Sequence, residues 1–456
     1  MNNLFGTDGI RCAVGTFPLT PDGMPKLGQA IGTWLKRKYI HTPKILIAED
    51  SRLSGSFLKH SLASGLLRYP IKIYDSGTLT TPAIFQLVQK QQLFDCGIII
   101  TASHNEYLDN GIKIITRTTG RLLEKDERAI KEILLQKDFH PINYKLLGST
   151  SYFFDAKEKY KACLKNYFKS KFLDGITIAL DCANGATSQF APEIFEELGA
   201  RVITTQNHPN GKNINFECGS VHPENIQSII KTKKANIGFA FDGDGDRLTI
   251  VNKNGQILDG DDIITLLLEH ESIQKEKAVV STIMSNQGLI DYLESKKIGH
   301  IASQVGEKSV VMQLIREGLI LGGEPSGHIV MRDYLSSSDA IFIALRVIET
   351  IKQNNNWDLV TFKKYPQVLI NLPIKIKQNL KNEPFNNLIE KYSNMLKPGR
   401  ILARYSGTEN ILRVMVESKN STAKELANSF IKEYKELEKF NKGPIREKRQ
   451  CVEKSI

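Results

Sequence analysis

Residues 241–247 read Phe-Asp-Gly-Asp-Gly-Asp-Arg and lie between two apolar runs, 235–241 and 248–251. This order predicts a β-strand, a tight acidic loop and a second strand. The two glycines let the backbone curl, so that the three carboxylates, Asp242, Asp244 and Asp246, converge on one point. Carboxylates this close repel one another unless a cation lies among them. Oxygen ligands favour a hard ion such as Mg²⁺, which usually keeps a position for a phosphate oxygen.

A solvated acidic turn and an EF-hand calcium loop are the alternatives for this stretch. Acidic turns rarely place three aspartates at strict two-residue spacing between apolar strands. An EF-hand would need glycine and glutamate where the chain has Arg247 and Lys253. We therefore predict one Mg²⁺ ion per chain at this loop.

The composition is that of an ordinary globular protein, with 456 residues of which 41% are hydrophobic and 24% charged. No apolar run approaches the length of a membrane span, and residues 1–11 lack the apolar core of a signal sequence. The six cysteines are scattered without a Cys-x-x-Cys pair, which favours reduced thiols over disulfides or a zinc site. We therefore expect a cytoplasmic protein that does not bind a membrane.

The formal net charge is +11, and the basic residues are spread along the whole chain. Because there is no basic block and no basic–aromatic interleaving, an anionic small substrate is favoured over nucleic acid. The tail, 443–456, mixes both charge signs without periodicity, and we expect it to be mobile.

A strand–helix–strand pattern occurs three times. The expected strand, helix and strand lie in turn at 44–48, 54–67 and 71–74, at 176–181, 188–198 and 201–204, and at 277–282, 287–296 and 300–304. Each copy predicts a β-α-β unit in a parallel or mixed sheet flanked by helices. The copies are too far apart for a solenoid, so they indicate three similar α/β domains.

The last segment has a different pattern. An extended stretch at 366–377 and strands at 399–404 and 411–418 precede an amphipathic helix that begins near 423. This order predicts a smaller α+β domain. We place the four domains at 1–150, 151–255, 256–368 and 369–442.

A candidate phosphate carrier follows the apolar strand 96–100. Ser103 and His104 lie just past its end, where α/β sheets present reactive groups. A serine that carries a phosphoryl group needs a metal to neutralise its oxygens, so this serine and the acidic loop complement each other. A plain turn residue that caps backbone amides is the alternative for Ser103.

Two further loops are rich in glycine and polar side chains. The first offers an acceptor, a hydroxyl and an imidazole, which suit sugar hydroxyls or an amine, from Glu324, Ser326 and His328. The second offers a cation, hydroxyls and backbone amides, which suit a phosphate, from Arg404, Ser406, Gly407 and Thr408. Ordinary polar turns are the alternative for both loops.

Together with Phe-Gly-Thr-Asp-Gly-Ile-Arg at 5–11, these motifs resemble the α-D-phosphohexomutase superfamily. The likeness runs from Phe5 to about Glu438, with one motif per domain in the family's order. The stretches 213–224 and 322–329 resemble the branch that acts on glucosamine phosphates. The resemblance implies four domains around a central cleft, three of them similar mixed-sheet α/β domains and the last a smaller α+β domain.

The resemblance also implies a reaction. Ser103 would be carried as phosphoserine, and Mg²⁺ would be held by its phosphate and the three aspartates of the acidic loop. Phosphorylation of Ser103 would activate the enzyme. It would interconvert glucosamine 6-phosphate and glucosamine 1-phosphate through glucosamine 1,6-bisphosphate, a step toward UDP-N-acetylglucosamine and peptidoglycan.

The other motif residues receive roles from the same resemblance. Charge neutralisation would come from Arg11, His104 and Arg247, and acid–base assistance from Lys113 with Arg11. The sugar would contact Glu324, Ser326 and His328. The phosphate that is not transferred would contact Arg404, Ser406, Gly407 and Thr408.

The chain departs from the family pattern at four positions. Glu106 and Asn410 replace prolines, Cys12 replaces a glycine, and Lys308 replaces an arginine. We expect a divergent but active enzyme, with slower turnover or an altered substrate preference. The alternatives are a phosphomannomutase or phosphoglucomutase, a metal-dependent phosphatase and a non-catalytic sugar-phosphate sensor. The sequence leaves a homodimer open.

Overall fold

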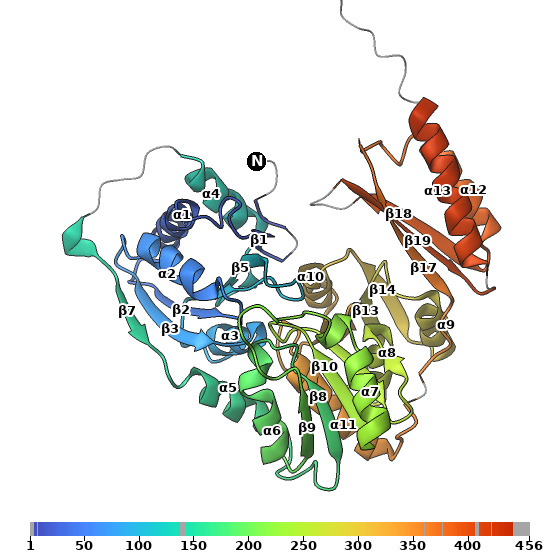
Figure 1. Cartoon of the computed structure of the whole chain (residues 1–456), viewed down its shortest axis with the longest axis horizontal. Coiled ribbons are helices and arrows are strands. Elements are labelled where there is room, and N and C mark those ends of the chain that lie inside the picture. Colours follow the sequence, from blue (N-terminus) through green and yellow to red (C-terminus); the bar gives the residue numbers. More distant parts are fainter. Residues whose placement is uncertain are drawn as a thin grey trace, which may run out of the picture. The chain divides into compact units, whose positions relative to one another are not determined.

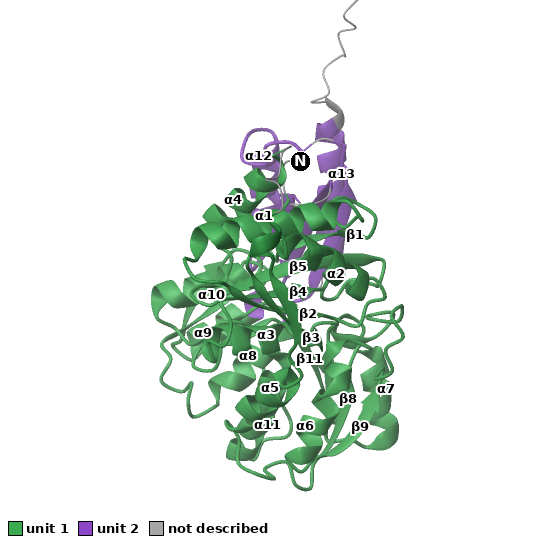
Figure 2. Ribbon diagram, turned by 90° about the vertical axis from the view of Figure 1, so that its left-hand side faces the viewer, with its two compact units in different colours: residues 1–285, 289–362 green, residues 286–288, 363–456 purple. Residues whose placement is uncertain are grey.

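The computed structural model describes residues 4–6, 8–136, 143–359, 361–375, 377–405, 410–420 and 422–440. They form two compact units, Met1–Ser285 with Leu289–Phe362 and Asn286–Gly288 with Lys363–Ile456 (Figure 2). None of the described helices is long and apolar enough to cross a membrane. The predicted tail, 443–456, lies outside the described residues. The predicted central cleft and domain boundaries stay predictions.

The first sheet has seven strands, in the order β1-β5-β4-β2-β3-β7 with β6 beside β5 (Figure 1). The strands are β1 (Ile10–Ala13), β2 (Lys44–Glu49), β3 (Lys72–Thr78), β4 (Cys96–Ile100), β5 (Asp109–Thr116), β6 (Gly120–Arg121) and β7 (Ser149–Tyr152). β2, β3 and β4 are parallel to one another, whereas β5 is antiparallel to β4 and β1. The sheet is therefore mixed, as predicted.

Helices cover both faces of this sheet. They are α1 (Gly23–Lys38), α2 (Gly55–Leu66), α3 (Thr81–Phe85), η1 (Gln86–Lys90), α4 (Glu124–Leu134) and α5 (Ala156–Lys165). Alternation along β2 explains this layering, because successive side chains of a strand point to opposite faces. Ile45 and Ile47 belong to the core with α1, α2 and α4, whereas Leu46 and Ala48 belong to the core with α3, η1 and α5.

The second sheet has the order β12-β11-β10-β8-β9, and the third β14-β13-β15-β16. The second contains β8 (Thr177–Asp181), β9 (Arg201–Thr205), β10 (Ile237–Phe241), β11 (Leu248–Asn252) and β12 (Ile257–Leu258), with α6 (Ala191–Glu197) and α7 (Glu224–Lys233). The third contains β13 (Ala278–Thr282), β14 (Gly299–Ser303), β15 (Leu321–Gly323) and β16 (Ile329–Met331), with α8 (Gly260–Leu268), α9 (Gln287–Ser295), α10 (Glu307–Glu317) and α11 (Ala340–Asn354). Short 3₁₀ turns are η2 (Tyr144–Leu146), η3 (Ala186–Gln189) and η4 (Gly219–Val221).

The three predicted β-α-β units are confirmed. In each one the two predicted strands are parallel neighbours: β2 with β3, β8 with β9, and β13 with β14. One hydrophobic core cluster includes Leu46 of the first sheet, Ile178 of the second and Val279 of the third. The loops at the strand ends of the three sheets are therefore supported by a shared core.

The second unit contains one antiparallel sheet in the order β17-β19-β18. Its elements are β17 (Gln367–Pro373), α12 (Phe385–Met395), β18 (Gly399–Tyr405), β19 (Ile411–Ser418) and α13 (Ala423–Phe440). Phe385 and Tyr392 of α12 share a core with Phe430 of α13 and Val414 of β19. The predicted smaller α+β domain is confirmed, and α12 is an additional helix that the sequence did not predict.

Candidate active site

The acidic loop links β10 to β11, as its sequence predicts. Asp242, Asp244 and Asp246 are fully buried, and each offers one oxygen within 4.8 Å of the others. Burial and the neighbouring charges of Asp246 and Asp244 raise the pKa of Asp242 well above its usual range. One oxygen each of Asp244 and Asp246 accepts no hydrogen bond from the described residues. A buried set of convergent, partly unsatisfied oxygens fits a hard dication such as Mg²⁺.

Ser103 lies beside this loop. It follows β4, is fully buried, and its Oγ donates a hydrogen bond to Asp242 Oδ2 at 2.7 Å. The backbones also approach closely, because a Cβ on Gly243 would lie 2.6 Å from the Ser103 carbonyl oxygen. The structure therefore brings together the serine and the acidic loop, which lie on different sheets.

His104 and Arg11 lie at the edge of the serine loop. His104 Nδ1 is 3.5 Å from Ser103 Oγ, and Arg11 Nη1 donates to Asn105 Oδ1 at 3.3 Å. Burial, together with the charges of Arg247 and Arg11, lowers the pKa of His104 to about 2. The imidazole beside the serine is therefore neutral.

Lys113 reaches the acidic loop from β5. Its Nζ lies 2.7 Å from Asp244 Oδ2, 2.8 Å from Asp246 Oδ2 and 2.8 Å from Asp8 Oδ2. Burial disfavours the ammonium, but the three carboxylates outweigh it and raise the pKa of Lys113 above its usual range. A fixed positive charge thus lies against two of the candidate metal ligands.

The third-sheet loop joins this group through His328. Arg247 Nε donates to His328 Nε2 at 3.0 Å, and His328 Nδ1 lies 3.5 Å from Asp246 Oδ1. Burial and the charge of Arg247 lower the pKa of His328 well below its usual range. Glu324 is buried and accepts from Gly306 N–H at 2.8 Å, whereas Ser326 is exposed. The loop thus presents one buried carboxylate and one exposed hydroxyl.

The fourth motif belongs to the second unit. Arg404 lies on β18, opposite Arg413 of β19. Ser406, Gly407 and Thr408 lie outside the described residues, so their predicted phosphate contact stays a prediction.

A chain of charged residues extends from the site and was not predicted. Arg121 contacts both Asp8 and Glu307, and Asp8 in turn contacts Lys113. Glu307 also accepts from Ser337 Oγ at 2.7 Å. Asp8 stands inside the N-terminal motif and Glu307 directly precedes Lys308, a position compared with the family pattern, whereas Arg121 lies in a stretch without a recognisable pattern.

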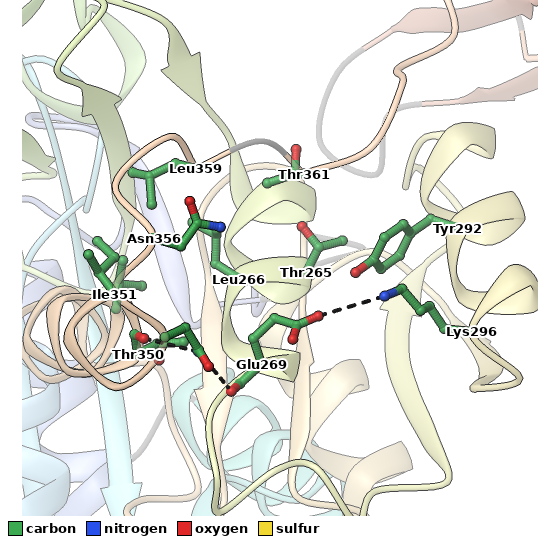
Figure 3. A pocket seen from close by; sticks show the side chains of 12 residues that line it. Thr265, Leu266, Glu269, Tyr292, Lys296, Thr350, Ile351, Asn356, Leu359 and Thr361 are labelled. Carbon is green, nitrogen blue, oxygen red and sulfur yellow. Dashed lines mark hydrogen bonds and ion pairs between the residues drawn. The ribbon is translucent and has the colours of Figure 1, made fainter.

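One cavity in the part of the chain that the structure describes is lined by none of these residues. It has a volume of about 400 Å³ and is bordered by α8, α9, α11 and the segment after α11 (Figure 3). Glu269 and Lys296 form a 4.0 Å ion pair in its wall. None of the predicted site residues lines this cavity, so it does not contribute to the candidate active site.

Models of one protein family match the chain in four consecutive pieces. They describe phosphoglucomutase/phosphomannomutase α/β/α domain I over 2–141, domain II over 155–255, domain III over 259–365 and the C-terminal domain over 375–432. A phosphoglucosamine mutase of Thermodesulfovibrio yellowstonii is 40% identical over 91% of this chain and 95% of its own length. One of Campylobacter curvus is 38% identical over 96% of this chain and 98% of its own length.

Solved structures share the fold. A phosphoglucomutase/phosphomannomutase family protein of Burkholderia thailandensis has a TM-score of 0.76 at 23% identity, covering 96% of this chain and 98% of that one. N-acetylphosphoglucosamine mutase of Aspergillus fumigatus, solved with GlcNAc-6P and magnesium, has a TM-score of 0.63 at 17% identity, covering 95% of both chains. The chain therefore belongs to the phosphoglucomutase/phosphomannomutase family of the α-D-phosphohexomutase superfamily.

Proposed function

We propose that this chain is a phosphoglucosamine mutase, an isomerase that interconverts glucosamine 6-phosphate and glucosamine 1-phosphate. The observation that carries the mechanism is the 2.7 Å hydrogen bond from Ser103 Oγ to Asp242 in a loop of three buried carboxylates. The choice of sugar is supported by the relatives named phosphoglucosamine mutase, at 38–40% identity. Ser103 is the phosphoryl carrier in this proposal.

In the first transfer, the free hydroxyl of the sugar phosphate attacks the phosphorus of phosphoserine. The new bond joins the sugar oxygen to phosphorus, the bond from Ser103 Oγ to phosphorus breaks, and the hydroxyl proton replaces the lost phosphoryl group on the serine. The product is glucosamine 1,6-bisphosphate. After this intermediate turns round, the other phosphoryl group returns to Ser103, so no net phosphate or proton is consumed.

The site residues support this chemistry mainly by position and charge. Mg²⁺, held by Asp242, Asp244, Asp246 and the phosphoserine, would neutralise charge on the transferred group. Arg11 and Arg247 add fixed cations at the edge of the serine loop, and the Lys113 ammonium assists proton transfer as the donor. Phosphoryl transfer needs little else from a protein, because it depends on alignment and electrostatic stabilisation.

Sugar recognition is assigned to the two remaining motifs. Glu324, Ser326 and His328 contact the sugar, and Arg404, Ser406, Gly407 and Thr408 hold the phosphate that stays in place. One fixed phosphate site suits a substrate that must bind in two orientations. We place the reaction in the cytoplasm, on the route to UDP-N-acetylglucosamine and peptidoglycan, and the free thiols of the five described cysteines support a reducing compartment.

A phosphomannomutase or phosphoglucomutase is the second candidate. The matching family models carry both names, and the serine and acidic loop would serve either sugar equally. Turnover of glucosamine, glucose and mannose 6-phosphates, each with Mg²⁺ and a trace of the matching bisphosphate, distinguishes the candidates. Preference for glucosamine 6-phosphate supports the proposal, whereas preference for another sugar transfers the chain to the second candidate.

The serine mechanism is tested by Ser103→Ala, with Ser56→Ala as a matched control. Ser56 is an exposed α2 residue whose hydroxyl contacts only His60 among the described side chains. Ser103→Ala should abolish turnover and the 80 Da mass increase of phosphorylation, and the control should retain both. Substantial turnover by Ser103→Ala would refute the carrier role.

A further inference from the structure

Ser103 has a left-handed backbone conformation, with a φ of 51°. Residues with a Cβ adopt this conformation rarely, because it brings Cβ close to the backbone. Such a conformation persists only where the surrounding structure enforces it, and it concentrates at functional sites. The loop 103–106 must therefore be held by groups outside it.

Arg52 donates four hydrogen bonds here, three to this loop and one to Asp109 at the start of β5. Its Nη2 donates to the carbonyl oxygens of Ser103 at 2.9 Å and Asn105 at 2.6 Å, and its Nη1 donates to those of Glu106 and, at 3.0 Å, Asp109. The side chain is fully buried. Its Nε donates to Asp50 at 2.9 Å, which fixes the plane of the guanidinium. Rigid, forked donors of this kind are specific to arginine.

Asn215 binds the same two carbonyl oxygens from another domain. Its Nδ2 donates to Ser103 O at 2.7 Å and to Asn105 O at 2.9 Å. The residue is 3% exposed, and its own N–H donates to Ala183 in the loop that follows β8. The serine loop is therefore clamped between a residue of the first sheet's domain and a residue of the second sheet's domain.

We propose that Arg52 and Asn215 are positioning residues that hold Ser103 Oγ toward the acidic loop for phosphoryl transfer. This inference rests on the proposed function of Ser103. Loss of either donor set would let the serine backbone relax from its left-handed conformation and carry Oγ away from Asp242. Glu106 stands where the resemblance expects proline, so these side-chain donors supply rigidity that the loop backbone lacks.

The first test uses two variants. Arg52→Lys keeps the positive charge but loses the forked N–H donors of the guanidinium, and Asn215→Asp keeps the side-chain shape but loses the amide N–H donors. For each variant, kcat with glucosamine 6-phosphate should fall by roughly tenfold to a hundredfold. KM should stay within about twofold of that of the unsubstituted protein, because neither residue is assigned to sugar binding. Intact mass after incubation with Mg²⁺ and glucose 1,6-bisphosphate should show slower phosphorylation of Ser103. Circular dichroism establishes folding, and if Arg52→Lys does not fold, the isosteric Asn215→Asp decides.

Two control variants remove similar contacts elsewhere. Asn213→Ala loses bonds to Asn210 and His208 within the same segment, and Arg332→Lys loses bonds to the carbonyl oxygens of Leu314 and Leu319. Neither residue contacts the serine loop, so kcat should stay within about twofold of the unsubstituted protein. An equal loss of kcat in these controls would show a general structural effect and overturn the inference.

A rescue variant separates positioning from stability. Glu106→Pro, added to Arg52→Lys, should recover kcat at least about threefold, because proline restricts residues 105 and 106. The Glu106 N–H makes no hydrogen bond to the described residues, and its φ is not positive, so proline removes no bond there. Full kcat in both Arg52→Lys and Asn215→Asp, with the parent phosphorylated, overturns the inference. Absence of turnover and phosphoserine in the parent refutes the proposed function, and the inference with it.

Discussion

Replacement of Arg121 by methionine should destabilise the first unit by about 3 kcal/mol. The Arg121 side chain is 12% exposed and contacts the carboxylates of Asp8 and Glu307. Removing one partner of a buried pair usually costs about 3–5 kcal/mol, because the other charge is left uncompensated. The lower value applies because Glu307 keeps the Ser337 hydroxyl at 2.7 Å and the Ser338 N–H at 2.6 Å. Methionine retains the packing against Phe85.

A double-mutant cycle isolates the interaction between Arg121 and Glu307. Glu307→Gln should lower the free energy of unfolding by about 2 kcal/mol, because Arg121 keeps its ion pair with Asp8. The double variant should cost about 3 rather than about 5 kcal/mol, which gives a coupling of about 2 kcal/mol. The control pair, Glu127 with Lys308, also joins the first and third domains at 2.7 Å, but its side chains are 21% and 26% exposed. Solvent screening should reduce its coupling to about 0.5 kcal/mol or less.

Urea unfolding can be followed in each domain separately, because the chain has only two tryptophans. Trp34 is buried in α1, and Trp357 follows α11. Trp357→Phe leaves a reporter of the first domain, and Trp34→Phe leaves a reporter of the third. Both tryptophan reporters should show the loss of unfolding free energy, because the Arg121–Glu307 ion pair joins the two domains. A coupling for Arg121 and Glu307 no larger than that of the control pair would refute this reasoning.

Three further predictions concern a buried carboxylate, a glycine contact and the metal. Burial raises the pKa of Asp339 to about 6, so between about pH 4 and 6 the folded protein keeps a proton that the unfolded chain has lost. As the pH rises from about 4 to about 6, the free energy of unfolding should therefore fall by about 3 kcal/mol relative to that of Asp339→Asn. If the difference in unfolding free energy between the two proteins does not change with pH in urea titrations, the prediction is wrong. Gly243→Ala places a Cβ 2.6 Å from the Ser103 carbonyl oxygen and should lower kcat. In the control variant Gly318→Ala the new Cβ meets no atom within 4 Å, so only Tm should fall. Equal kcat values for the two variants would contradict this prediction. Asp244→Asn should weaken Mg²⁺ binding at least about tenfold by calorimetry, and unchanged affinity would remove the acidic loop from the metal site.

The sequence predicts the three α/β units because their signals are local. Each strand is an apolar run, and each helix carries its own apolar stripe. Helix α12 was missed although its buried residues Phe385, Leu388 and Tyr392 have the spacing of one helix face, because its three asparagines and one serine have a low helix propensity. Its existence depends on packing against α13 and the fourth sheet, which no short window contains.

The candidate site likewise contains residues that local sequence motifs predict and residues that only the structure reveals. Ser103 and the acidic loop were found because each carries a compact chemical pattern, and their roles stay predictions. Arg52 and Asn215 act on the serine loop from 51 and 112 residues away along the chain. A single arginine or asparagine in a loop has no pattern of its own. Only the tertiary structure shows that both donate to the same two carbonyl oxygens.

The buried charges of the site follow an alternating order that explains their presence. Glu307, Arg121, Asp8, Lys113 and the acidic loop form a chain in which each charge contacts the opposite sign. In the proposed function, phosphorylation of Ser103 would add about two negative charges beside Asp242, and a dication in the acidic loop would offset them. We therefore expect the phosphoryl group and the metal ion to stabilise each other's binding, so that by linkage the phosphorylated chain should bind Mg²⁺ more tightly than the unphosphorylated chain.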